Sequence, residues 1–135
     1  MNSEELEHQL RNLGFLEVQR YEDERTGSSE VVLTDDVVDI AIFNDRGERG
    51  VTLGTRGEDR YVIPTWITTL GMNTLRPTTV SEQAEWIIAN LPPVRTAVTS
   101  DAGLGKRLHG ANWALLRERL GLPPGAVATD PSTWR

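Results

Sequence analysis

Hydrophobic positions in the first half of the chain fall into short β-rich runs, at residues 30–33, 37–43 and 50–54. The runs contain many β-branched side chains, and turn-forming Asp, Asn and Gly residues separate them. Strands joined by such short segments pair antiparallel, because a parallel pair needs a long crossover. The pattern therefore predicts a β-meander of four to five strands. Residues 15–21 are expected to form a half-buried strand before it, and residues 61–63 a last strand after it.

Segments with helical spacing precede and follow the predicted strands in the sequence. Leucines recur at the spacing of one helix face over residues 3–13, which predicts a helix there. Gly14, directly after this range, provides a stop signal. A short helix is expected to start at Thr65 and to end at Gly71. The fold class that follows is α+β: an N-terminal helix, the meander, and then three helices packing on one sheet face.

Two longer helices complete the prediction. Thr79 and Glu82 have the spacing of a capping box, and the helix behind them is expected to stop before Pro92 and Pro93. A final helix is expected over residues 104–120. Its predicted inward-facing side chains are Leu108, Ala111, Leu115 and Leu116.

The length of 135 residues fits a single domain, with residues 122–135 expected to form an extended, flexible tail that contains Trp134. There is no cysteine, which excludes a disulfide scaffold, a thiolate metal site and a cysteine nucleophile. No apolar run is long enough to cross a membrane, and the acidic start is unlike a signal peptide. We therefore expect a cytoplasmic protein.

Charge is distributed unevenly along the chain. Residues 1–60 contain 15 Asp and Glu against 7 Arg, whereas residues 61–135 contain 5 Asp and Glu against 7 Lys and Arg. An acidic half repels phosphate backbones and attracts cationic partners. Direct binding to nucleic acid is therefore not expected.

The sequence shows no arrangement typical of catalysis or of cofactor binding. His8 and His109 lack ligand-spaced neighbours, so no metal site is predicted. The segment 103–107 contains Gly-x-Gly-Lys but lacks the first glycine and the Ser or Thr of a phosphate-binding loop. We therefore expect neither enzymatic activity nor a cofactor.

One stretch resembles a known group of proteins. It comprises Leu13-Gly14-Phe15, the turn Asn44-Asp45-Arg46-Gly47, and Leu53-Gly54 followed by Tyr61, Pro64, Trp66 and Leu70. Over residues 13–71 this pattern resembles small actinobacterial proteins of unassigned function. The small, acidic α+β layout is similar to that of immunity proteins of polymorphic toxin systems. That resemblance implies a non-catalytic protein that neutralises a toxin.

The first functional hypothesis is therefore a protein-binding module of the immunity type, with an acidic surface for a cationic toxin. Trp66 and Trp134 border predicted loops and are further candidates for contact with the partner. The predicted partner-binding residues are Glu22, Asp23, Glu24, Asp35, Asp36, Asp39, Asp45, Glu48, Glu58, Asp59, Trp66 and Trp134.

The second hypothesis is a regulatory protein that binds a small molecule or an anion in a pocket between sheet and helices. Its candidate contacts are Arg76, Arg95, Lys106 and Arg107. A homodimer is compatible with both hypotheses, because an edge strand of the meander is expected to be free to pair.

Overall fold

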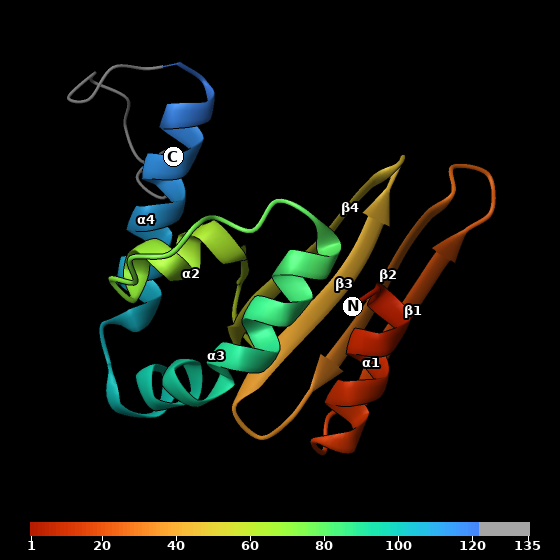
Figure 1. Ribbon diagram of the computed structural model, residues 1–135, viewed down its shortest axis with the longest axis horizontal. Helices are drawn as coiled ribbons and strands as arrows, with labels where there is room; N and C mark the ends of the chain where they lie inside the picture. Colours follow the sequence, from red (N-terminus) through yellow and green to blue (C-terminus); the bar gives the residue numbers. More distant parts are fainter. Residues whose placement is uncertain (122–135) are drawn as a thin grey trace.

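The computed structural model describes residues 1–121, so the predictions for the tail and for Trp134 lie outside the described residues. The order of elements is α1 (Ser3–Asn12), β1 (Leu16–Asp23), β2 (Ser28–Thr34), β3 (Val38–Asp45), β4 (Glu48–Thr55), β5 (Arg60–Val62), α2 (Ile63–Thr69), α3 (Val80–Ser100) and α4 (Leu104–Arg119). The predicted α+β arrangement is confirmed, with one helix before the sheet and three after it (Figure 1).

The sheet is a pure meander. Its five strands lie in the spatial order β1-β2-β3-β4-β5, and each pair of neighbours is antiparallel. The β1–β2 and β3–β4 turns therefore lie at one end of the sheet, here called the hairpin end. The β2–β3 and β4–β5 loops lie at the opposite end. This alternation decides which polar side chains meet.

The turn between β3 and β4 has only two residues. Arg46 has a φ of 53° and Gly47 a φ of 89°. Positive φ at both central positions is the type I′ geometry, whose twist matches that of the flanking strands. The tight turn places Asp45 directly opposite Glu48.

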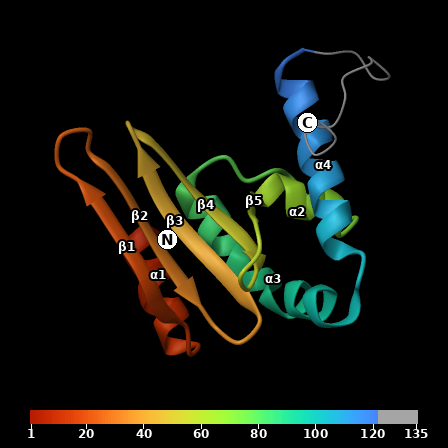
Figure 2. The ribbon, with the colours of Figure 1, turned by 180° about the vertical axis from the view of Figure 1, so that it is seen from behind.

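α1 and α3 cover one face of the sheet, and Figure 2 shows the other face, in front of them. We call that second face the open face. The hydrophobic core lies on the helix side and comprises Leu6, Leu10, Phe15, Val31, Leu33, Val38, Ile40, Ile42, Val51, Leu53, Ile63, Trp66, Ile67, Ala84, Trp86, Ile87, Leu91, Val94, Leu104 and Leu108. Along each strand, the neighbours of these residues point to the open face.

The prediction that the third helix ends before Pro92 is wrong. α3 runs from Val80 to Ser100 and contains both Pro92 and Pro93. A proline within a helix removes one backbone hydrogen bond and bends the helix without necessarily ending it. Figure 1 shows this bend, after which the second part of α3 runs toward the start of α4. Leu91 and Val94, on either side of the prolines, are both buried and keep the two parts of the helix on the core.

α4 packs mainly against α2 rather than flat on the sheet, and its second half extends away from the strands (Figures 1 and 2). Leu108 is buried as predicted, but Leu116 is 38% exposed and Leu115 is only half-buried. The prediction that Leu116 points inward is therefore wrong, because the helix has left the core at that position. Within residues 1–121, no helix combines the length and the apolar composition needed to cross a membrane.

β1 is more exposed than its sequence pattern predicts. It forms an edge of the sheet, and seven of its eight residues are exposed. The strand register shifts between Glu17 and Gln19, which leaves Val18 in a β-bulge. The half-buried strand expected over residues 15–21 is thus an edge strand whose main buried contribution is Phe15, just before it.

The start of α3 is fixed by the predicted capping box. The Thr79 hydroxyl accepts a hydrogen bond from the Glu82 amide at 3.1 Å, and the Glu82 carboxylate accepts one from the Thr79 amide at 3.2 Å. Hydrogen bonding from the Thr79 side chain lowers the pKa of Glu82. A carboxyl group with a lowered pKa stabilises the fold above its ordinary pKa and loses that contribution as the pH falls through the lowered value.

We expect Thr79→Ala to lower the free energy of unfolding by about 1 kcal/mol, because the substitution removes a helix cap. Urea denaturation monitored by circular dichroism measures this, with Thr74→Ala in the preceding exposed segment as the control. The difference between Thr79→Ala and the parent protein should shrink in acid, where Glu82 is protonated. An equal loss in the control variant would contradict the capping role.

Candidate functional site

The meander divides the ten acidic candidates between the two ends of the sheet. Glu22, Asp23, Glu24, Asp45 and Glu48 lie at the hairpin end, and Asp35, Asp36, Asp39, Glu58 and Asp59 lie at the opposite end. At about 3.3 Å per residue, the length of the strands separates the two groups by roughly 20 Å. The ten carboxylates therefore do not form one continuous surface.

Two of the carboxylates at the opposite end are used within the fold. Asp39 is 8% exposed; its Oδ1 accepts a hydrogen bond from the Thr34 hydroxyl at 2.5 Å and its Oδ2 one from the Gly57 amide at 2.9 Å. Asp35 Oδ1 accepts the amides of Val37 and Val38, both at 2.8 Å, and Oδ2 pairs with the Arg95 guanidinium. Asp39 in particular is too buried to contact a partner. Its hydrogen bonds instead hold the two loops at this end of the sheet together.

The remaining members of that group, Asp36, Glu58 and Asp59, are exposed. Asp36 lies 4.0 Å from Arg56, and both side chains are well exposed, so this pair contributes little. Near Glu58 and Asp59, the pKa of Tyr61 is raised, first by burial and then by these two carboxylates. A negative field therefore exists at this end too, but without a row of carboxylates like the one described below.

The prediction that Trp66 contacts a partner is wrong. Its side chain is completely buried, and its indole N–H donates a hydrogen bond to the Leu53 carbonyl oxygen at 2.7 Å. The residue lies in α2, which follows β5 directly and turns this face toward β4. Trp66 is thus a core residue that ties α2 to the sheet.

At the hairpin end, acidic side chains line up across the open face. Asp23 lies opposite Ser28, and Asp45 opposite Glu48. The Ser28 hydroxyl donates a hydrogen bond to Asp45 Oδ1 at 3.0 Å, which joins the two hairpins. Residues opposite one another in antiparallel strands project to the same face. The three carboxylates therefore share one cross-strand row, which we call the acidic row.

Two aromatic rings lie one row further in. Tyr21 pairs with Glu30, and Glu30 with Phe43, so an acidic side chain separates the rings. Phe43 lies over Gly50, where an added Cβ would be only 2.7 Å from the ring. Together with Asp45, Glu48 and their neighbours, these side chains line a hollow of about 380 Å³.

The electrostatic character of this hollow is negative. The charge of Asp23 raises the pKa of Tyr21, whose phenol lies 3.4 Å from Asp23 Oδ2. Glu30 is partly neutralised by Arg60, which reaches it across the open face from β5 at 3.6 Å. Glu48 is exposed, and its side chain forms no hydrogen bond or ion pair with residues 1–121. The hollow therefore suits a positively charged group with an apolar or planar part.

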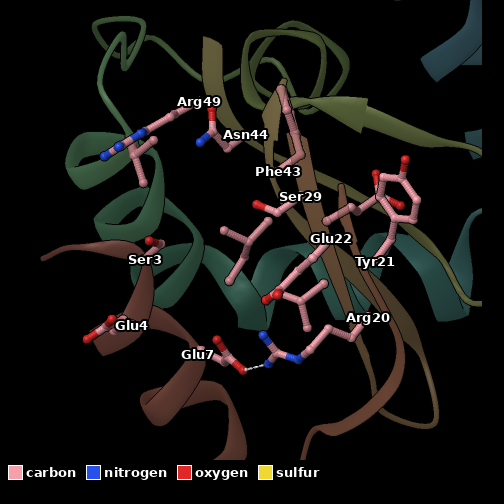
Figure 3. Close-up of a pocket in the computed structure, with 14 residues that line it drawn as sticks. Ser3, Glu4, Glu7, Arg20, Tyr21, Glu22, Ser29, Phe43, Asn44 and Arg49 are labelled. Atoms are coloured by element: carbon pink, nitrogen blue, oxygen red, sulfur yellow. Dashed lines mark hydrogen bonds and ion pairs between the residues drawn. The ribbon is translucent and has the colours of Figure 1, made fainter. Parts of the chain in front are cut away.

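A second cavity, of about 370 Å³, lies on the helix side of the same end (Figure 3). The strand register places Glu22, Ser29, Asn44 and Arg49 in one row across β1 to β4. The next row contributes Arg20, Val31 and Ile42. The first part of α1 supplies Ser3, Glu4 and Glu7 as one wall, and Val80 at the start of α3 adds to the lining. Tyr21, Glu30 and Phe43, from the intervening strand positions, also line the cavity.

Arg20 is neutralised by carboxylates beside this cavity. Its guanidinium contacts Glu7, as Figure 3 shows, and donates to Glu17 at 2.7 Å. Arg11 forms ion pairs with the same two carboxylates, at 3.2 Å from Glu7 and 2.9 Å from Glu17. These contacts raise the pKa of Arg20, primarily through its hydrogen bond to Glu17, so the four side chains form a closed charge network. The network attaches α1 to the edge strand.

The four basic residues proposed for anion binding do not come together. Arg95 pairs with Asp35, Arg107 with Asp101, and Arg76 lies 3.6 Å from Glu118. Lys106 is exposed at the start of α4. None of the four lines the cavity between the sheet and the helices, whose basic residues are Arg20 and Arg49.

Sequence reasoning identified the carboxylates of the acidic row but missed the residues around them. The sequence places Tyr21, Glu30 and Phe43 in predicted strands but does not show which face they present. The alternation along each strand is a partial signal, because residues two apart share a face, but strand register decides which face that is. His8 is exposed, and residues 1–121 contain no group of three or more potential ligands placed to hold a metal ion.

Comparison of the chain with protein-family models, curated proteins and solved structures finds no match.

Proposed function

We propose that this protein is a non-catalytic binding module of the immunity type, which neutralises a cationic protein toxin through the hairpin end of its open face. The observation that supports the proposal best is the acidic row beside the hollow: Asp23, Asp45 and Glu48 border a surface that also presents Tyr21 and Phe43. Glu24, in the turn between β1 and β2, extends the negative surface around the first hairpin.

The physical chemistry of this surface fits a protein partner. Aligned carboxylates attract a basic surface over long range and speed its diffusional encounter. Tyr21 is 51% exposed and offers a rigid ring with a polar tip, the kind of side chain that anchors protein interfaces. The underlying β-sheet holds these groups in fixed positions, so little conformational entropy is lost on binding.

The partner is identified first, by affinity capture from the cells that produce the protein, at low and at moderate salt. The captured protein is then expressed in bacteria with and without this chain. Immunity requires that the partner alone arrests growth and that co-expression restores it. A partner that does not affect growth would contradict the immunity role while leaving a binding role in place.

We expect Glu24→Lys with Glu48→Lys to reduce the association rate for that partner at least about tenfold at low salt, because steering is electrostatic. The salt dependence of the rate should weaken at the same time. Stopped-flow or surface-based kinetics measures both. The matched control is Asp36→Lys with Glu58→Lys, which reverses two exposed charges at the opposite end. A comparable loss of association rate in the control would contradict the placement of the interface at the hairpin end.

A further inference from the structure

The helix-side cavity has opposite charges at the two ends of a single row of side chains. We propose that it is a binding site for a short zwitterionic peptide of about three residues. The ammonium group of the ligand lies at Glu22 and its carboxylate at Arg49. This site is on the other face of the sheet from the acidic row, so it does not depend on the proposed function.

The two terminal charges of the row are available to a ligand. Within residues 1–121, the side chains of Glu22 and Arg49 form no hydrogen bond or ion pair, although both line the cavity. Arg20 differs, because Glu7 and Glu17 already neutralise it. The cavity thus presents one unpaired carboxylate at β1 and one unpaired guanidinium at β4.

The surrounding elements strengthen this polarity. Glu4, in the first turn of α1, lines the cavity and also lacks an ion-pair partner in the described part of the chain. Val80, which also lines the cavity, is the first residue of α3, a helix of 21 residues. The N-terminus of a helix carries partial positive charge and favours a nearby anion.

The spacing of the charges selects the size of the ligand. Glu22 and Arg49 are separated by three steps between neighbouring strands, about 14 Å between their Cα atoms. Both side chains are long and reduce the gap that the ligand must span. An extended peptide of three residues is about 10 Å long. A single amino acid is too short to meet both charges at once.

The middle of the row offers the polar groups that a peptide backbone needs. Asn44 Oδ1 is shielded from solvent and accepts no hydrogen bond, which is costly for a buried acceptor. Rotation of this side-chain amide can turn the oxygen toward a donor in the cavity, because that torsion is broad. The Ser29 hydroxyl lies beside it in the row, and Val31 and Ile42 provide an apolar floor.

Nuclear magnetic resonance titration of the full, ¹⁵N-labelled chain tests the site directly. The probe is tri-alanine, compared with the same peptide acetylated at its N-terminus, amidated at its C-terminus, or blocked at both ends. A ligand of this size is expected to bind with a Kd of about 1 mM or tighter. Saturable shifts should appear at the amides of Ser29, Asn44 and Glu4, and the doubly blocked peptide should bind at least about tenfold more weakly.

Two variants assign the ends of the ligand. In Arg49→Gln, tri-alanine and its amidated form should bind equally, because the contact with the carboxylate is gone. In Glu22→Gln, the free and the acetylated peptide should bind equally. Arg25→Gln and Glu24→Gln remove charges of the same kind in the neighbouring turn, outside the cavity lining, and should leave every affinity within about twofold.

Each other outcome rejects the site. Equal binding of free and blocked peptides would show that charge is not recognised, and equal binding of alanine and tri-alanine would reject the spacing argument. Shifts confined to the open face would place the ligand elsewhere, and the absence of saturable shifts would exclude binding. Because the titration needs no toxin partner, its failure leaves the proposed function intact, and failure of the partner experiments leaves this site intact.

Discussion

Replacing Trp66 with alanine is expected to lower the free energy of unfolding by about 4 kcal/mol, since removal of a fully buried aromatic ring leaves a cavity in the core. The ring is 0% exposed, and its N–H group holds the Leu53 carbonyl oxygen of β4. Small domains are stable by only about 5–15 kcal/mol, so this loss is large. Urea denaturation followed by circular dichroism measures the change.

Trp66→Phe separates the two contributions of this side chain. Phenylalanine retains most of the apolar contact but cannot donate to Leu53, so we expect a smaller loss of about 1–2 kcal/mol. Trp113→Ala, in the part of α4 that is only half-buried, is the comparison for loss of a less buried ring. A change of less than about 1 kcal/mol in Trp66→Ala would contradict the buried position of Trp66.

Asp39→Ala is expected to destabilise the protein by about 2 kcal/mol, because it leaves the Gly57 amide without its side-chain acceptor. The Thr34 hydroxyl also loses its contact with Asp39 and keeps only the carbonyl oxygens of Asp35 and Val38. The same denaturation experiment applies. Asp36→Ala, three residues earlier and fully exposed, is the matched control and should change stability by less than about 0.5 kcal/mol.

A double-mutant cycle with Thr34→Val isolates the hydrogen bond between the two side chains. Thr34 and Asp39 lie opposite each other on β2 and β3, so the two substitutions should be non-additive. Additive losses would show that the two groups act independently. Binding of a toxin partner should survive Asp39→Ala under conditions where the variant is folded, because this carboxylate lies at the opposite end from the proposed interface.

Much of the fold was predictable because its signals are local. Short β-branched runs separated by turn residues predicted the meander, and the spacing of Thr79 and Glu82 predicted the start of α3. The error at Pro92 arose because the consequence of a proline depends on tertiary packing: burial of Leu91 and Val94 holds the bent helix on the core. The buried position of Trp66 likewise depends on a contact with β4 that residue spacing does not reveal.

The candidate site was less predictable, for a reason that lies in strand register. A shift of one residue moves every side chain of a strand to the other face, so a sequence pattern cannot decide which face Glu22 or Arg49 occupies. The separation of the acidic residues between the two ends follows from connectivity alone and could have been deduced from the meander. The role of Asp39 could not, because its partner Gly57 lies 18 residues away.

The two-residue turn between β3 and β4 also has a consequence for the order of folding. Arg46 and Gly47 close this hairpin with the smallest possible loop, and each remaining strand then adds next to its own neighbour in the chain. Closing a short loop costs little entropy, and a topology rich in local contacts folds faster than one that needs distant strands to meet. The β3–β4 hairpin is thus suited to act as a nucleus, from which the sheet grows outward in both directions. Both faces of the hairpin end, with the two proposed binding surfaces, are assembled on that nucleus.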